Sequence, residues 1–111
     1  MTWGAKRRAS EHAEAAFQAQ VEQLAQYLGW WPVHIYNTQR SKAGIPDLIL
    51  IRERVVWAEL KATSRLTGRT GKLMPEQENF RDMLLAAGQE WYKWTDSNDD
   101  WEEIQKVLAK V

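Results

Sequence analysis

Two hydrophobic runs in the middle of the chain decide the fold: Ile45-Pro46-Asp47-Leu48-Ile49-Leu50-Ile51 and Val55-Val56-Trp57-Ala58-Glu59-Leu60-Lys61. Both are rich in Ile, Val, Leu and Trp, and few residues separate them, so they are predicted to be neighbouring β-strands. An otherwise apolar strand has little reason to end in Glu-x-Lys. Charged groups that converge at strand ends indicate a divalent-metal site, because carboxylates supply hard oxygen ligands and a lysine can stabilise an anion beside them.

The length of the turn between the two runs decides whether Asp47 and Glu59 can share a metal ion. Opposite residues of an antiparallel pair share a face, and faces alternate along each strand. A regular two-residue turn at Glu53-Arg54 would point the two carboxylates to opposite faces. A metal site therefore requires an odd-length turn such as Arg52-Glu53-Arg54, a β-bulge, or a bend at Pro46.

The rest of the chain extends outward from these strands as alternating periodic segments and loops. The predicted order is α-β-β-β-α-β-α, an α/β fold with a mixed four-stranded sheet flanked by helices. The third strand, the helix after it and the fourth strand form a parallel βαβ unit. The further elements are a helix over residues 10–28, a strand over 30–36, a polar loop over 37–46, a loop over 62–73, a helix from Pro75 to Ala87, a strand over 90–94 and a final helix capped by Asp99 or Asp100.

Length and composition favour one domain over residues 1–111, with residues 1–9 as a flexible basic arm. No apolar run approaches the roughly 20 residues of a transmembrane helix, and no hydrophobic signal segment follows the basic N-terminus. We therefore expect no membrane association and a cytoplasmic location. The absence of cysteine excludes disulfides, zinc–thiolate sites and thiol nucleophiles.

Charge is distributed unevenly, although 15 basic and 15 acidic residues cancel. Residues 61–72 contain four basic residues and no acid, whereas residues 96–103 contain five acids and no base. A neutral protein can still present one basic face to phosphates. The candidate phosphate contacts lie in the two loops that flank the strands and are Arg40, Lys42, Arg65, Arg69 and Lys72; taken singly, each could equally be a solvated surface residue.

Further residues recur in a fixed order around the two strands. Gln77 lies in the first turn of the helix that begins at Pro75, and Glu14 is placed by helical spacing on the side of Phe17. With the segments 28–30, 44–48, 57–61, 75–77 and 90–94, this order resembles the PD-(D/E)XK nuclease superfamily. Within it, the chain is similar to the VRR-NUC family, especially its small stand-alone members from phages and bacteria. The resemblance covers roughly residues 11 to 108.

The resemblance implies a restriction-endonuclease-like core and a Mg²⁺-dependent DNA endonuclease in which Mn²⁺ can substitute. It implies Asp47 and Glu59 as direct metal ligands, the backbone carbonyl of Leu60 as a third, and Glu14 as a further candidate. Lys61 would orient the attacking water or stabilise developing charge, and Gln77 would hold Lys61, water or a phosphate. Small stand-alone relatives look like dimeric Holliday junction resolvases, so a homodimer that cuts branched or four-way DNA is expected, in a bacterial host cell if a phage encodes the chain.

Each of these residues also has a plainer alternative. Asp47 could be a turn aspartate after proline, and Glu59 with Lys61 a cross-strand ion pair. Glu14 could pair with an arginine or suit the helix dipole, and Gln77 could cap its own helix. Relatives often carry Ser or Thr where Met74 stands, so the cap of that helix must come from elsewhere or be absent. At the level of function, the alternatives are a nicking or flap nuclease and a catalytically inactive DNA-binding or assembly module of the same fold.

Overall fold

A computed structural model describes residues 3–36, 42–64 and 66–110, with residues 3–11 described by their backbone alone. The order of its elements is the predicted α-β-β-β-α-β-α, so this prediction is confirmed. In chain order the elements are α1 (Trp3–Tyr27), β1 (Trp31–His34), β2 (Leu48–Ile51), β3 (Val55–Lys61), α2 (Pro75–Ala86), β4 (Glu90–Thr95) and α3 (Asn98–Ala109).

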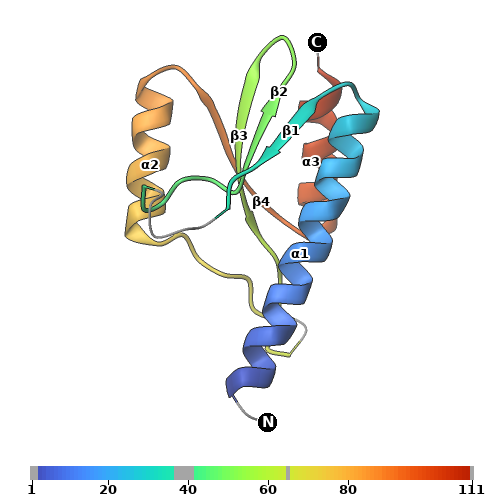
Figure 1. Ribbon diagram of the computed structural model, residues 1–111, viewed down its shortest axis with the longest axis vertical. Helices are drawn as coiled ribbons and strands as arrows, with labels where there is room; N and C mark the ends of the chain where they lie inside the picture. The colour runs from blue at the N-terminus through green and yellow to red at the C-terminus, as the bar shows by residue number, and fades with distance from the viewer. Residues whose placement is uncertain (1–2, 37–41, 65, 111) are drawn as a thin grey trace.

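The four strands form one mixed sheet in the order β1-β2-β3-β4. The first three strands pair antiparallel as a meander, and β4 pairs parallel to β3 after the crossover through α2. Both features agree with the predicted mixed sheet. The sheet lies between α1 and α3 on one side and α2 on the other (Figure 1).

The main hydrophobic core lies between the sheet and the pair α1 and α3. Alternate residues of β2 and β3 point to this side and are buried, because side chains alternate between the two faces of a strand. They pack against Phe17, Val21 and Ala25 of α1 and against Ile104 and Leu108 of α3. The buried strand residues of this core are Leu48, Leu50, Val56, Ala58, Leu60 and Trp94.

Helix α1 begins at Trp3, whereas we expected it to begin near Ser10 after a separate basic arm. This correction has a simple cause, since residues 5–16 are almost all good helix formers and contain neither proline nor glycine. The side of α1 that packs on the sheet includes Ala13, Phe17 and Val21. Glu14 follows Ala13 by one position, about 100° around the helix, and is exposed. Its predicted placement on the apolar side was wrong.

The N-cap of α3 lies two or three residues before its predicted position. Ser97 is the N-cap, and its hydroxyl accepts a hydrogen bond from the backbone N–H of Asp100 at 3.1 Å. Asp100 is unavailable as a cap because its carboxylate accepts bonds from the backbone N–H and the hydroxyl of Thr95 at 2.7 and 2.6 Å. The predicted cap at Asp99 or Asp100 is thereby corrected to Ser97.

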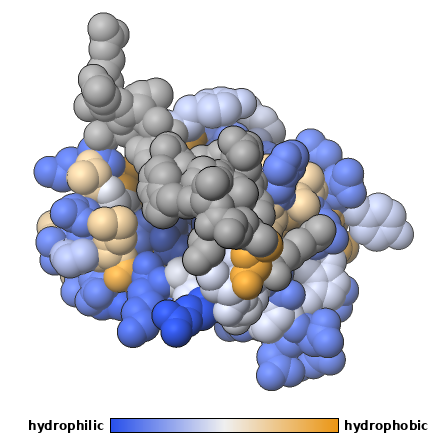
Figure 2. Space-filling view, turned by 90° about the horizontal axis from the view of Figure 1, so that it is seen from below, coloured by the Kyte–Doolittle hydropathy of each residue, from blue (hydrophilic) through white to orange (hydrophobic). Residues whose placement is uncertain are grey.

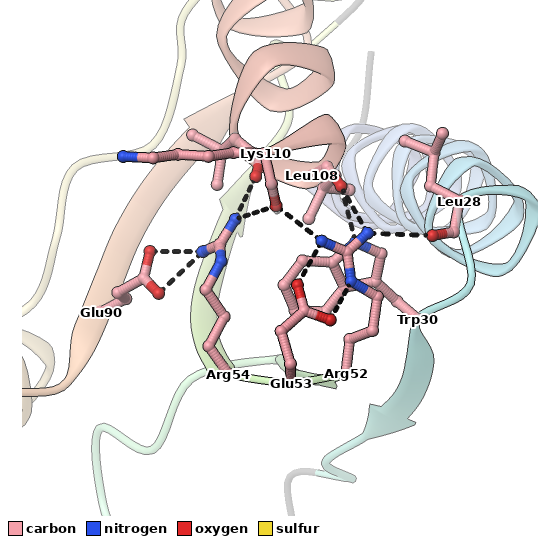
Figure 3. A network of polar contacts seen from close by, with 9 residues as sticks. Leu28, Trp30, Arg52, Glu53, Arg54, Glu90, Leu108 and Lys110 are labelled. Atoms are coloured by element: carbon pink, nitrogen blue, oxygen red, sulfur yellow. Dashed lines mark hydrogen bonds and ion pairs between the residues drawn. The ribbon is translucent and has the colours of Figure 1, made fainter.

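Two arginines of the β2–β3 turn fix the ends of α1 and α3 (Figure 3). Arg52 donates to the carbonyl of Leu28 at 3.1 Å and to that of Lys110 at 2.6 Å. Arg54 donates to Glu90 at 2.6 and 2.7 Å and also to the carbonyl of Val107. Both guanidinium groups lie against the ring of the buried Trp30, at 4.7 and 4.9 Å from its centroid. These donors satisfy helix carbonyls that have no partner within their own helices.

Candidate metal centre

Asp47 and Glu59 are brought together by the register of the β2–β3 hairpin. Ile51 pairs with Val55 and Leu48 pairs with Ala58, so three residues connect the strands and the next opposed positions belong to the two acids. The required odd-length turn, Arg52 to Arg54, is therefore confirmed. Both carboxylates lie on the face opposite the main core, which is the face that α2 covers.

Asp47 is anchored against the backbone of β3. Its Oδ2 accepts a hydrogen bond from the N–H of Leu60 at 2.8 Å, and its own carbonyl accepts one from Ile35 at 2.9 Å. In a β-strand, the N–H and C=O of one residue point to the same side. The carbonyl of Leu60 therefore points toward the end of β2 where Asp47 lies, which is compatible with its predicted role as a ligand.

Glu59 is a buried acid with one unsatisfied oxygen. The residue is 3% exposed, and its Oε1 accepts from Nε2 of Gln77 at 2.9 Å and faces Nζ of Lys61 at 3.6 Å. Its Oε2 is buried and has no hydrogen-bond partner among the described residues. Burial first, and then the charge of Asp47, raise the pKa of the Glu59 carboxyl to about 8, while Lys61 opposes the rise.

A divalent cation fits this arrangement of groups. A buried carboxylate oxygen without a partner beside a second carboxylate is costly unless a positive charge is added. Mg²⁺ is commonly held by one or two carboxylates and keeps several waters, so two acids and a carbonyl suffice for it. Among the described residues, Lys61 supplies a cation at this point, and its side chain is 14% exposed.

Gln77 serves two partners at once: it bonds the start of its own helix, as the plainer alternative had it, and it reaches Glu59, which was not among its predicted partners. The Oε1 of Gln77 accepts from the backbone N–H of Met74 at 2.8 Å, while Met74, the N-cap residue of α2, offers no side-chain cap of its own. Its Nε2 donates to Glu59. Because the oxygen is occupied by Met74, the amide can present only its NH₂ group to the carboxylate. The sequence showed Gln77 but gave no sign that the Met74 N–H sets its orientation.

Glu14 is not brought into this centre. Within the described part of the chain, no three His, Asp or Glu side chains lie close enough together to hold a metal ion. Glu14 is exposed on α1, and the site of Asp47 and Glu59 lies on the other face of the sheet. The structure therefore gathers four of the predicted site residues, Asp47, Glu59, Lys61 and Gln77, and leaves out the fifth.

The predicted phosphate contacts are only partly placed. Arg40 and Arg65 lie outside the described residues. Arg69 and Lys72 are exposed in the loop after β3, which folds back on itself through a 2.8 Å bond between the hydroxyls of Thr63 and Thr70. This loop lies at the end of the molecule seen in Figure 2, where described residues are mostly hydrophilic.

Lys42 lines an open groove of about 470 Å³ between the loop before Asp47 and α2, together with Glu76, Phe80 and Met83. Of the adjacent tryptophans 30 and 31, Trp30 is buried and donates to the carbonyl of Leu108, whereas Trp31 is 68% exposed. Among the described helices, none is long and apolar enough to cross a membrane.

Comparisons of this chain with protein families, curated proteins and solved structures found no significant match. The VRR-NUC resemblance therefore stays a prediction.

Proposed function

We propose that this protein is a Mg²⁺-dependent DNA endonuclease with a PD-(D/E)XK core of the VRR-NUC type. The single observation that carries the proposal is the buried Glu59. The charge of Asp47 acts on the carboxyl group of this residue, its Oε2 has no partner among the described residues, and its Oε1 is contacted by Gln77 and Lys61. This combination is unnecessary for folding, since a buried acid with a raised pKa costs stability. Metal-dependent hydrolysis of a phosphodiester requires such a group, because a carboxylate oxygen must be free to bind the cation.

In this proposal Asp47, Glu59 and the carbonyl of Leu60 hold the cation. Bound Mg²⁺ would lower the pKa of a coordinated water and polarise a phosphoryl oxygen. Lys61 would stabilise the charge that develops on the phosphate, and Gln77 would fix the orientation of Glu59. Mn²⁺ is expected to substitute, because it also accepts carboxylate and carbonyl oxygens.

The proposed substrate is branched DNA, with four-way junctions first. Basic residues that contact phosphates carry no sequence code, so recognition of DNA shape is favoured over recognition of bases. We also propose that the protein works as a homodimer in the cytoplasm, because two-fold symmetry would place two sites on two strands of a junction. The exposed Trp31 is a candidate for the contact between subunits.

A cleavage assay on linear, flap and four-way DNA tests the proposal. The wild-type protein should cut in Mg²⁺ and not in EDTA, with the four-way junction cut fastest. Asp47→Asn and Glu59→Gln should abolish cleavage, whereas Asp82→Asn, an exposed acid of α2, should cut normally. Full activity of either site variant in Mg²⁺ would rule out the proposed site. Preference for the flap over the junction would favour the flap-nuclease alternative.

A catalytically inactive DNA-binding module is the second candidate. It is favoured by one observation, the lack of a third acid at the site among the described residues. Binding of four-way DNA without cleavage in Mg²⁺ or Mn²⁺ would select it.

A further inference from the structure

Gly44 lies where the loop that leads to Asp47 meets the first turn of α2. Its φ is +87°, and a Cβ atom built on it would lie 2.2 Å from the carbonyl oxygen of Glu76 and 2.8 Å from the backbone nitrogen of Gln77. Contacts below 3.0 Å are not tolerated, and backbone atoms cannot rotate away as a flexible side chain can. Loop and helix therefore touch backbone to backbone at this point, which only glycine permits.

This contact joins the two halves of the candidate metal centre. Asp47 follows Gly44 by three residues and is fixed to β3 through the N–H of Leu60. On the other side, the first turn of α2 carries Gln77, whose amide is oriented by Met74 and donates to Glu59 at 2.9 Å. The distance between the Asp47 loop and this turn thus determines whether Gln77 reaches Glu59.

The size of the effect follows from these distances. Ordinary contact begins at about 3.4 Å, so a methyl group at Gly44 would push the turn away by about 1 Å. The bond from Gln77 to Glu59 would then exceed the roughly 3.2 Å limit of an N–H···O hydrogen bond. A misplacement of this size in a catalytic site can cost about a hundredfold in rate.

We propose that Gly44 is a positioning residue of the metal centre, which sets Gln77 against Glu59 and so leaves the other Glu59 oxygen for the cation. The part concerning the cation rests on the proposed function. The part concerning Gln77 does not, because the loop–helix contact and the hydrogen bond exist without metal.

Gly44→Ala is the test, and Gly88→Ala is its matched control. Gly88 follows the other end of α2 and has a φ of +77°, and a Cβ atom built on it would meet no described atom within 4 Å. Both variants therefore introduce the same strain at positive φ, and only Gly44→Ala also introduces the close contact. Circular dichroism and thermal unfolding check that both fold.

The first readout is NMR of the Gln77 side-chain amide without metal. Its hydrogens should exchange with solvent at least about tenfold faster in Gly44→Ala than in wild type, and at the wild-type rate in Gly88→Ala. The second is calorimetric titration with Mn²⁺, where Gly44→Ala should weaken affinity by about 10- to 100-fold, as is typical when a ligand's orienting partner is lost. Gly88→Ala should keep the wild-type affinity.

Equal amide exchange in the two variants would overturn the proposal. If amide exchange changes as predicted and wild type binds no Mn²⁺, the positioning role stands and the proposed function fails. If Gly44→Ala does not fold, Gln77→Asn tests the proposal instead. Asn is one methylene shorter than Gln, so its amide lies farther from Glu59 while the loop–helix contact stays intact. Wild-type Mn²⁺ affinity in Gln77→Asn would show that the position of the Gln77 amide, which Gly44 is proposed to set, has no effect on the site.

Discussion

Glu59 is the residue on which the proposed chemistry depends, and its surroundings disfavour its ionised form. Apolar neighbours and Asp47 favour the protonated acid, while Lys61 only partly compensates. A group in this state is poised to exchange its proton for a cation. Cation binding should then release a proton below about pH 8, which makes metal affinity dependent on pH.

The first prediction concerns stability against pH without metal. Since the pKa of Glu59 is about 8 in the folded state and near 4.5 when unfolded, the folded form binds the proton more tightly. The contribution of protonated Glu59 to the free energy of unfolding is fully present below pH 4.5 and is lost as pH rises through 8. This loss is on the order of a few kcal/mol. Urea unfolding at pH 5 and pH 8.5 should show this loss in wild type and a smaller one in Glu59→Gln. The same loss in both proteins would contradict the assignment.

Residue type, order and the family resemblance singled out Asp47, Glu59, Lys61 and Gln77, but the sequence left open whether Asp47 and Glu59 share a face, which the three-residue turn decides. These signals were not enough for Glu14. Helical spacing allows either Ala13 or Glu14 to share the side of Phe17 and Val21, and only packing against the sheet chooses Ala13. The role of the Met74 N–H was also hidden, since backbone donors leave no mark in a sequence.

At the scale of elements, the β2–β3 hairpin determines both the site and the attachment of the helices. Its three-residue turn sets the register that pairs Asp47 with Glu59. The same turn carries Arg52 and Arg54, whose guanidinium groups bond the carbonyls at the ends of α1 and α3 (Figure 3). A single short turn thus links the face of the sheet that carries Asp47 and Glu59 to the helices of the opposite face.

The second prediction follows for Arg54. Arg54→Met removes donors to the partly buried Glu90 and to the carbonyl of Val107, so it should lower the free energy of unfolding by about 1–3 kcal/mol. Arg81→Met, which removes an exposed pair with the adjacent Asp82, is the control and should leave stability nearly unchanged. Denaturant unfolding measures both. Equal stability of the two variants would show that the turn does not hold α3.

The kind and order of the elements were predictable because their hydrophobic periods are clear, whereas their ends were not. Helix α1 extends to Trp3 because residues with high helix propensity continue past the apolar stripe. The cap of α3 moved to Ser97 because Asp100 is engaged by Thr95. The ends of helices depend on competition between neighbouring polar groups for hydrogen bonds. The hydrophobic period of a sequence contains no information about this competition.

On the scale of the whole molecule, exposed cations lie at both ends of the sheet. Arg69 and Lys72 are exposed in the loop that follows β3, at the end where Glu59 and Lys61 lie. Lys106 and Lys110 are exposed near the C-terminus of α3, at the opposite end in Figure 1. Zero net charge does not show where these cations lie, so the proposed phosphate contacts were chosen from the place of each charge in the sequence.

The third prediction concerns the basic loop. Replacing Arg69 and Lys72 with alanine should weaken binding to four-way DNA and reduce the slope of log K against log salt by up to about two, because fewer counterions are released. The pair Lys106→Ala and Lys110→Ala removes the same charge from the other end and should change neither quantity. Fluorescence anisotropy across a salt titration measures both. Equal effects of the two double variants would mean that the loop lies off the DNA path.

The most direct test of the metal centre is calorimetric titration of the protein with Mn²⁺ at pH 8.5, where the Glu59 proton is mostly lost. Wild type and Asp82→Asn should bind with the same affinity. Asp47→Asn and Glu59→Gln, each of which removes one charged oxygen ligand, should show no binding at the same site. Wild-type affinity in both of these variants would contradict a metal centre at Asp47 and Glu59.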